Sequence, residues 1–497
     1  MVILIENMAL SKELEHNIDI FKKIFKNHED INYRVIENVH NKKIRICLIS
    51  VDGMIDKVLI NDNILKPIML TKLEGLDFSK NNIYKTVNSV ILTNEITMTS
   101  NIDDLVTSLL YGDAILMFDG LDEAILIGSR HLETRSISEP TSERTVKGPK
   151  EGFVELISVN VSLIRRRIKS PNLIFKFKEI GTETKTTISY CYIKGIVNTE
   201  IIKELEDRLS KIKDIDAVLS PQHIIELIRD EPYSPFDTMG STERPDSVVG
   251  KLLEGRIAIL VDGSPVAITI PFIFQEYFQA SEDYYINYYY ASFNRLIRYI
   301  SFFLTISTPA LYISLVTFHR EMLPTPLILS IISARQGVPL PAILEALMLL
   351  FVFEILREAG VRFPEQIGSA VSIVGALIIG EAAVTARLVS APIVIVIALT
   401  GISGFLVFSI KGAIIFCRTL FLIMAGFFGV FGYVFGIIML VLHLMSLKSF
   451  GVPYMLNMTS IKKQDLKDTV IRAPWWYMGL RPNIIGKENL VRKKSKD

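Results

Sequence analysis

Residues 299–318 read YISFFLTISTPALYISLVTF, a run of twenty residues without a charged side chain. A helix of about twenty apolar residues can cross the roughly 30 Å hydrocarbon core of a membrane. Pro309 lies within this run, and membrane helices tolerate proline because neighbouring helices can satisfy the carbonyl group that it leaves unpaired. The run therefore predicts a membrane span that separates a long N-terminal region from further apolar sequence.

Several apolar segments follow this first span and predict an all-α membrane domain over residues 299–447, with four to six spans. The further candidates are residues 339–356, 366–386, 388–410 and 419–447. Two of these segments are interrupted by glutamates, which are Glu345, Glu354 and Glu381. Residues 323–341, LPTPLILSIISARQGVPLP, are flanked by proline and contain Arg335, so we expect a re-entrant or interfacial segment there.

Both ends of the chain are expected on the cytoplasmic side. Residues 450–497 carry ten Lys and Arg against four Asp and Glu, and such a positive excess marks cytoplasmic segments. The short basic tail, residues 448–497, is therefore predicted to be cytosolic. The N-terminus lacks the pattern of a secretory signal, which places the N-terminal half on the same side. With both ends on one side, the chain must cross the membrane an even number of times. Five candidate spans are an odd number, so either one of them does not cross or a further segment does.

Residues 366–386 combine a stripe of small side chains with a membrane charge. Small residues recur every four positions and share one helix face, at Gly368, Ser372, Ala376 and Gly380. Such stripes let helices approach closely, within one chain or between copies, and both alternatives remain open. Glu381 lies about 100° round the helix from Gly380, and charge at membrane depth faces a bundle interior or an aqueous path. These five residues are our candidates for pore lining or helix packing.

Glu345 and Arg387 are secondary candidates for functional charge in the membrane domain. Arg387 follows Glu381 by six residues, about 120° round a helix, so the two side chains cannot readily pair on one continuous helix. We interpret Arg387 as part of a break between two helices, with a side chain that reaches the interface.

Residues 281–298 precede the first span and contain five tyrosines followed by Arg295 and Arg298. This composition suits an interfacial helix at the headgroup level of a membrane. A tyrosine-rich helix packed on the soluble region is an equally good interpretation. In either case the segment marks the junction between the two parts of the chain.

The N-terminal region reads as a cytosolic α/β protein of two subdomains, with an extension at residues 1–85 and a main region at 86–280. In three places Asp-Gly lies between two apolar β-branched runs, the strongest short-range signal for a hairpin. These places are residues 46–60, 114–127 and 258–270, with Asp52, Asp119 and Asp262 as turn residues. A repeated supersecondary unit and a coincidence of hairpin composition both remain open.

The sequence lacks the motifs of several classes of enzymes and cofactor-binding proteins. The P-loop pattern, H-E-x-x-H and G-x-S-x-G are absent, so we expect neither an enzyme nor a cofactor. Three cysteines lie far apart, which argues against a disulfide framework or a structural metal site. The net charge of +1 gives no indication of a nucleic-acid partner. The cluster Arg165–Arg167 with Lys169 could bind phosphate or lipid headgroups, although such a cluster is more often a solvated face.

An ordered set of motifs resembles the GerA family of spore germination proteins, specifically the A subunit of a nutrient germinant receptor. The motifs are SERTVKGPKEGFVE (142–155), SLIRRRIKSPNL (162–173), SPFDTMGSTERPD (234–246), EGRIAILVDGSPVAITIP (254–271), SEDYY (281–285), TFHREMLPTPLILSI (317–331), FEILREAGVRFPEQIGSAVSIVGALIIGEAAV (353–384) and RPN (481–483). The resemblance covers residues 86–485, and residues 1–85 carry no recognisable motif. The loop 234–246 contributes the family residues Asp237, Glu243, Arg244, Pro245 and Asp246.

The resemblance implies an integral protein of the inner membrane of the spore, with two partners, a transporter-like B subunit that takes the germinant and a lipoprotein C subunit. It also implies a homo-oligomer that conducts monovalent ions when nutrient binds. The alternative is a non-conducting scaffold that couples the nutrient-binding subunit to downstream germination machinery. The family pattern has a neutral residue at the position of Glu381, and Arg387 is also atypical, so this charge pair is not a family signature.

Overall fold

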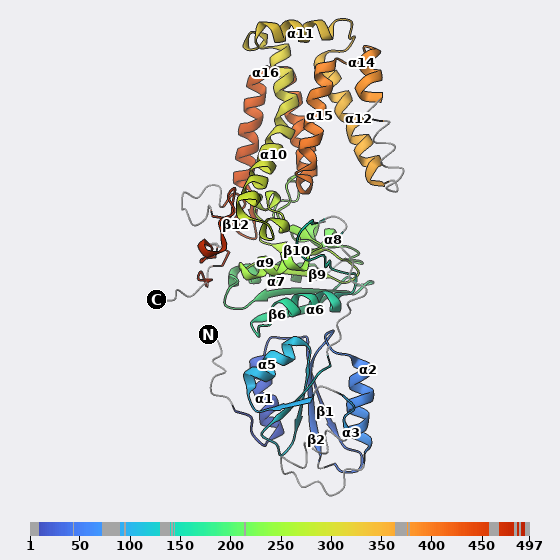
Figure 1. Ribbon diagram of the computed structural model, residues 1–497, viewed down its shortest axis with the longest axis vertical. Coiled ribbons are helices and arrows are strands. Elements are labelled where there is room, and N and C mark those ends of the chain that lie inside the picture. Colours follow the sequence, from blue (N-terminus) through green and yellow to red (C-terminus); the bar gives the residue numbers. More distant parts are fainter. Residues whose placement is uncertain are drawn as a thin grey trace.

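The structure is a computed structural model in which a soluble α/β part and a bundle of helices lie end to end (Figure 1). It describes residues 9–42, 44–71, 90–93, 96–129, 140, 143, 145–212, 215–362, 375, 378–456, 467–481, 485–486 and 489–492. The soluble part consists of two α/β units, and the helical bundle extends away from the second of them (Figure 1).

The first unit is a five-stranded antiparallel sheet with helices on both faces. Its strands, in the order β1-β2-β4-β5-β3, are β1 (Ile31–Glu37), β2 (Arg45–Val51), β3 (Ile96–Thr99), β4 (Ala114–Phe118) and β5 (Ala124–Ile127). One face is covered by α1 (Leu14–Ile24) and α5 (Ile102–Tyr111). The other is covered by α2 (Lys57–Leu59), η1 (Ile60–Leu65) and α3 (Lys66–Leu70). Because both faces are covered, β2 and β4 are buried along almost their whole length.

The second unit repeats this arrangement. Its strands, in the order β6-β7-β9-β10-β8, are β6 (Leu173–Ile180), β7 (Thr186–Ile193), β8 (Gly240–Thr242), β9 (Ile257–Val261) and β10 (Ala267–Ile270). Its helices are α6 (Ile157–Arg167) and α9 (Pro245–Leu253) on one face, and α7 (Thr199–Lys211) and α8 (Pro221–Ile228) on the other. The relative strand order is the same in both units, which favours the repeated supersecondary unit over a coincidence of composition.

Two of the three predicted hairpins are confirmed and one is wrong. The hairpin β4–β5 turns at Asp119-Gly120 and β9–β10 turns at Asp262-Gly263, with both glycines at positive φ. Asp52-Gly53 instead leads from β2 into α2, because β2 already pairs with β1 and β4 on its two sides. The first sheet also needs β3, β4 and β5 to be complete, so this unit continues past the expected boundary at residue 85 to residue 127.

A buried ion pair links the two units. Arg165 of α6 donates from Nε and Nη2 to the two carboxylate oxygens of Asp30, at 2.7 and 2.9 Å, and both residues are buried. The adjacent Arg166 and Arg167 each pair with Glu151, at 2.6 and 2.7 Å. The arginine cluster is therefore engaged within the protein and is not simply a solvated face.

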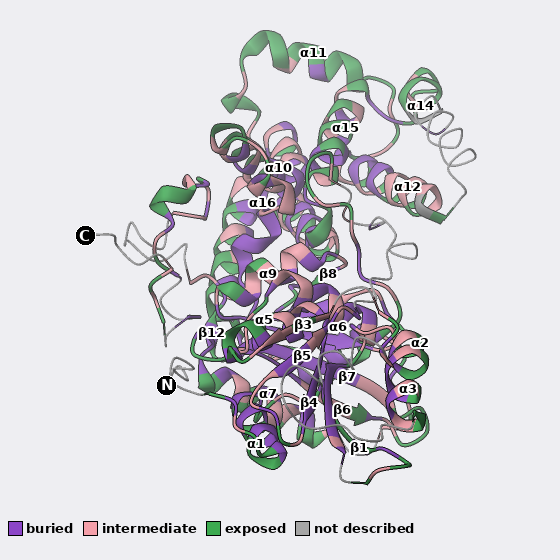
Figure 2. Cartoon of the chain, turned by 60° about the horizontal axis from the view of Figure 1, so that its bottom comes forward, coloured by how far each residue is buried: buried purple, intermediate pink, exposed green. Residues whose placement is uncertain are grey.

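The helical part consists of long helices that run away from the soluble part and one helix that lies across their far end (Figure 1). Its elements are α10 (Tyr288–Thr317), α11 (Thr325–Arg335), α12 (Ala342–Arg362), η5 (Ile378–Ala382), α14 (Ala383–Thr385), α15 (Ala391–Phe405) and α16 (Lys411–Ser446). The crossing helix is α11, within the segment expected to be re-entrant or interfacial. Within the described residues, two helices, Tyr288–Thr317 and Phe408–Ser446, are long and apolar enough to cross a membrane. Figure 2 shows buried residues throughout both sheets and exposed ones over α11 and α14.

Helix α16 is a helical hairpin and not one straight helix. Gly429 has φ 61° and ψ −142°, outside the helical region. Beyond it the chain folds back, so that the rings of Phe421 and Tyr433 lie 6.1 Å apart and Gly436 faces Phe421. The segment predicted as one span, 419–447, therefore contains a reversal of direction. The two halves of α16, residues 411–428 and 430–446, each contain enough residues for a helix of about 25 Å.

Both ends of the bundle are anchored in the second soluble unit. The segment 281–298 is not a separate interfacial helix, because η3 (Ser281–Tyr284) is followed by α10, which runs on without a break. After α16 the chain forms the short strands β11 (Lys448–Ser449) and β12 (Val452–Pro453). Phe450, Val452 and Ile485 then join the hydrophobic core of the second unit.

Candidate functional site

The loop 234–246, between α8 and α9, lies where the soluble part meets the last half of α16. Ser234 Oγ lies 2.9 Å from His443 Nε2, and the rings of Phe236 and His443 are 5.9 Å apart. Two side chains from the returning chain donate to main-chain carbonyls of the loop, Tyr454 to Asp237 at 2.9 Å and Ser449 to Thr238 at 2.6 Å. A displacement of this loop would therefore act directly on the base of the bundle.

The end of the loop is held in place by four of the residues that the sequence singles out, Glu243, Arg244, Pro245 and Asp246. Arg244 is buried and pairs with Asp246 through Nε and Nη2, at 3.1 and 2.8 Å, and also donates to the carbonyl of Pro149 at 2.8 Å. Pro245 begins α9, a position that suits its fixed φ. The carbonyl of Glu243 accepts from Phe153 N at 2.8 Å. These four residues position the loop, and Asp237, Arg244 and Asp246 line a cavity.

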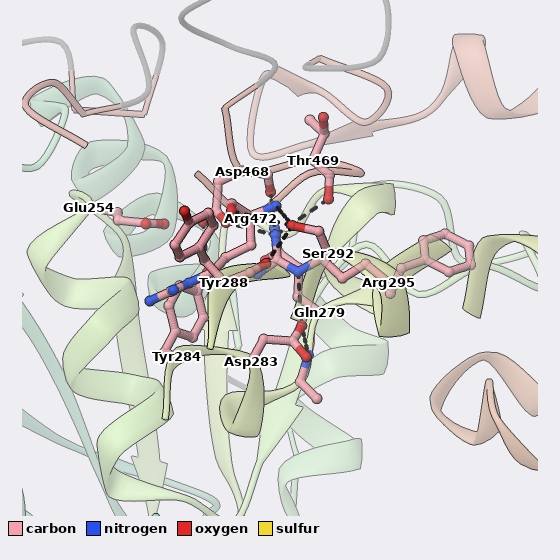
Figure 3. A network of polar contacts seen from close by, with 12 residues as sticks. Glu254, Gln279, Asp283, Tyr284, Tyr288, Ser292, Arg295, Asp468, Thr469 and Arg472 are labelled. Carbon is pink, nitrogen blue, oxygen red and sulfur yellow. Dashed lines mark hydrogen bonds and ion pairs between the residues drawn. The ribbon is translucent and has the colours of Figure 1, made fainter. Parts of the chain in front are cut away.

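A network of ion pairs fixes the base of α10 (Figure 3). Arg295 is fully buried and donates to Asp283 at 2.8 Å and to Asp468 at 2.7 Å. Arg298 makes a bidentate contact with the same Asp283, at 2.9 and 3.0 Å. Removing one member of a buried ion pair typically costs about 3–5 kcal/mol, because the remaining charge is left without compensation. The network therefore ties α10, η3 and the C-terminal tail into one unit.

Neutral groups complete the network around Asp468 and Arg472 (Figure 3). Gln279 donates to the carbonyl of Asp468 at 2.6 Å, and the hydroxyl of Tyr284 donates to its carboxylate at 2.7 Å. Burial and the adjacent carboxylate of Asp468 hold the pKa of Tyr284 well above its usual value, so the phenol stays protonated and can donate. Ser292 of α10 accepts from the main-chain N of Arg472 at 3.1 Å.

A second charged cluster lies beneath α9. Glu276 of η2 (Phe274–Phe278) contacts Arg256 and also Lys251, the latter at 3.1 Å. Burial alone would raise the pKa of Glu276, but Arg256 and Lys251 outweigh it and lower the pKa, so this carboxylate is charged at neutral pH. The cluster joins α9 and β9 to the segment that leads into the bundle.

A cavity of about 930 Å³ lies between α9, η2, η3 and the C-terminal tail. Its lining includes Glu143, Asp237, Arg244, Phe272, Tyr277 and Trp475. Burial raises the pKa of Glu143, which is half-buried, whereas Asp237 is exposed, and both residues line the cavity. The junction thus combines a loop that contacts α16, an ion network that holds α10 and a cavity between them.

A family model described as Bacillus/Clostridium GerA spore germination protein matches residues 19–484. The chain belongs to the GerA family. The matched region begins at residue 19 and not at 86, so the first α/β unit is part of the GerA region and the shorter resemblance read from the motifs is corrected. The motifs quoted from the sequence all lie after the first unit, which ends at residue 127.

Two relatives from Bacillus subtilis (strain 168) are similar to this GerA chain along nearly its whole length. Spore germination protein KA is 40% identical over 98% of this chain and 89% of its own. YfkQ, described as an uncharacterised membrane protein, is 38% identical over 97% of this chain and 93% of its own. The crystal structure of the N-terminal domain of the A subunit of the Bacillus megaterium spore germinant receptor GerK3 is 30% identical, covers 54% of this chain and 98% of that one, and has a TM-score of 0.42.

Glu345 of the GerA bundle is buried and fully engaged. Its carboxylate accepts from Arg335 at 3.1 Å and from the main-chain N and hydroxyl of Ser390, at 3.0 and 2.8 Å. Because Ser390 precedes α15, Glu345 places a negative charge at the positive end of that helix. The side chain therefore joins α11, α12 and α15 at the end of the bundle far from the soluble part.

The other sequence candidates lie near the same end or outside the described residues. Arg387 follows α14, has φ 55° and is exposed, which places it in a break between two helices. Gly380 and Glu381 are exposed in η5, a π-helical turn. Gly368, Ser372 and Ala376 lie outside the described residues, so the stripe of small side chains remains a prediction.

The structure adds a charged cluster that the sequence analysis did not identify. Glu354 of α12 contacts both Arg357 and Arg418, the latter at 2.7 Å, and Arg418 is buried. The spacing of Glu354 and Arg357 on one helix could have predicted their pairing. Arg418 comes from α16, and no local pattern connects it to α12.

Proposed function

We propose that this protein is the A subunit of a nutrient germinant receptor in the inner membrane of the spore, and that it converts nutrient binding by the receptor complex into germination as an oligomeric ligand-gated ion channel. The family match over nearly the whole chain carries the proposal. The relative KA is itself named a spore germination protein. Its partners in the receptor are a transporter-like B subunit, which takes the nutrient, and a lipoprotein C subunit.

The helical bundle is the membrane part of the receptor. Helix α10 and the segment Phe408–Ser446, which contains the hairpin of α16, have the length and apolar character of membrane-crossing segments, and the relative YfkQ is described as a membrane protein. Counting the two halves of α16 separately raises the number of candidate spans from five to six. An even number returns the chain to its starting side, which agrees with a cytosolic soluble part and a cytosolic basic tail.

The junction transmits the signal between the two parts. The first helix of the bundle, α10, is held by Asp283 and Asp468, and the last half of α16 is held by the loop 234–246. A change in the soluble unit would therefore move both helices together. Residues 366–386, with Gly380 and Glu381, then line or support the ion path, while Glu345 stabilises the distant end of the bundle.

Replacement of Glu381 by Gln in spores tests the channel role. We expect slower release of monovalent cations after nutrient addition, because the substitution removes an exposed charge from η5. Glu358→Gln is the matched control, since Glu358 is also exposed but pairs with Arg362 on α12. Unchanged release kinetics in Glu381→Gln spores with normal receptor levels would remove Glu381 from the ion path.

Reconstitution separates the channel from the alternative of a non-conducting scaffold. The ion networks at the junction would also serve a scaffold, which couples partners without a path through the bundle. The purified receptor with its B and C subunits is placed in planar bilayers and nutrient is added. A gated conductance supports the channel, and its absence in an assembled, nutrient-binding complex supports the scaffold.

A further inference from the structure

The cavity at the junction has the size of a small-molecule site. Its volume of about 930 Å³ lies at the upper end of the range of roughly 300–1,000 Å³ that is usual for pockets that bind organic ligands. A bare ion or a single water would leave most of this space unfilled. Trp475 and Tyr285 line the cavity and are also exposed, so the space is open to solvent at that edge.

Each cationic side chain that lines the cavity already has a partner, either a carboxylate or main-chain carbonyl groups. Carboxylates lie within 4 Å of five of them, in the pairs Arg167–Glu151, Arg244–Asp246, Lys251–Glu276, Arg256–Glu276 and Arg492–Glu254. The sixth, Arg481, donates to the main-chain carbonyls of Leu253, Asn489 and Val491. An anionic ligand would have to displace one of these partners.

Two acidic side chains of the lining lack such a partner in the part of the chain that the structure describes. Glu143 accepts from the hydroxyl of Thr242 at 2.5 Å, and the two cations that lower its pKa, Lys251 and Arg244, are paired with Glu276 and Asp246. The Asp237 side chain hydrogen-bonds with the hydroxyl of Tyr277, and Arg229 acts on it only from beyond ion-pair distance. Burial raises the pKa of Glu143, which is the expected result for a carboxylate without close compensation, whereas Asp237 is exposed at the cavity.

Aromatic rings supply the rest of a cation site. Phe272 and Tyr277 both line the cavity and meet edge to face, with ring centroids 4.9 Å apart. The ammonium of Lys251 already lies 5.5 Å from the centroid of Phe272, so this wall accepts a positive charge. In the described ranges no group of three or more His, Cys, Asp or Glu side chains could hold a metal ion. The acceptors and rings therefore suit an ammonium group on an organic body.

We propose that this cavity is a binding site for a small organic ammonium compound, whose cationic group is neutralised by Asp237 or Glu143 and whose body packs against Phe272 and Tyr277. The site lies on the soluble side of the A subunit and is independent of ion conduction through the bundle. Because the loop that carries Asp237 contacts His443 of α16, an occupied cavity would stabilise one arrangement of the junction.

The proposal is tested on the full-length protein in detergent with three small probes. The probes share a benzyl or phenyl ring and differ in the charge of the attached group. Benzylammonium, benzyl alcohol and benzoate are titrated calorimetrically in sodium phosphate, since amine buffers would compete. We expect benzylammonium to bind at least about tenfold more tightly than the other two, a difference typical of one charge-assisted contact. Equal binding of benzylammonium and benzyl alcohol, preference for benzoate, or complete displacement of benzylammonium by an equal concentration of potassium would overturn the assignment.

Isosteric variants then locate the contact. Asp237→Asn or Glu143→Gln should weaken benzylammonium binding about tenfold or more, with a melting temperature that remains close to that of the unmodified protein. Asp207→Asn is the matched control, because Asp207 pairs with Lys211 on α7 and does not line the cavity. Unchanged binding in both cavity variants would refute the site, even if the protein conducts ions as proposed.

Discussion

At the scale of single residues, Arg295 holds the base of α10 in place through two ion pairs, a role that no sequence motif indicated. Its partners Asp283 and Asp468 are 12 and 173 residues away, so the sequence could place it near a membrane surface but could not predict the ion network. The loop residues Arg244 and Asp246 were identified by resemblance, and their mutual pairing follows from being two residues apart at the start of α9. Ion pairs between residues far apart in the chain cannot be predicted from local sequence patterns.

Arg295→Met should destabilise the protein by about 3–5 kcal/mol, because Asp283 remains buried with one cation fewer. Arg362→Met is the control, since Arg362 and Glu358 form an exposed pair on α12 that should contribute little. Thermal unfolding in detergent measures both. A melting temperature for Arg295→Met equal to that of Arg362→Met would show that the network does not hold the base of α10.

His28 should make the soluble part sensitive to acid. Burial, followed by the adjacent Arg165, lowers the pKa of His28 to about 4, against 6.5 in an unfolded chain. Between these values only the unfolded chain binds the proton, so stability falls as the pH falls from 6.5 to 4, by up to about 3 kcal/mol. Unfolding monitored against pH should therefore show a weaker dependence in His28→Gln. His16→Gln, on the exposed side of α1, should keep the original slope, and equal slopes in all three proteins would contradict the assignment.

At the scale of elements, hairpins were predictable where both strands were local. Asp119-Gly120 and Asp262-Gly263 join strands that pair with each other, whereas Asp52-Gly53 follows a strand whose partners come from elsewhere in the chain. The reversal in α16 was missed because both halves of the hairpin are apolar and no polar turn separates them. Apolar runs therefore predicted the membrane part but not its turns.

Gly429→Ala should disrupt that reversal. A side chain at φ 61° and ψ −142° is strained, by about 1–3 kcal/mol, and its Cβ would lie 2.9 Å from the His319 ring and 3.0 Å from Phe318. Gly412→Ala, in the same helix with open space around its Cβ, should be neutral or slightly stabilising. Melting temperature and yield of monodisperse protein compare the two. If both variants behave like the unmodified protein, the sharp turn at Gly429 is not required.

At the scale of the whole molecule, two α/β units share one strand order, and the helical bundle extends from the second of them. The first helix of the bundle starts at this unit, and the chain after the last helix packs into its core. Composition and apolar runs were enough to predict a soluble α/β half and a helical half. They could not show that the first sheet continues past residue 85, because its later strands look like those of any α/β protein. They also could not show that the tail enters the soluble core through Phe450 and Ile485.

The central claim is that several copies of this chain surround an ion path through the membrane. Cryo-electron microscopy of the receptor extracted in mild detergent tests it most directly. We predict a closed ring of A subunits with the soluble units on one side, residues 366–386 near the central axis and a continuous opening along it. A stably monomeric chain, or a ring whose axis is filled by packed side chains in the presence of nutrient, would contradict the account.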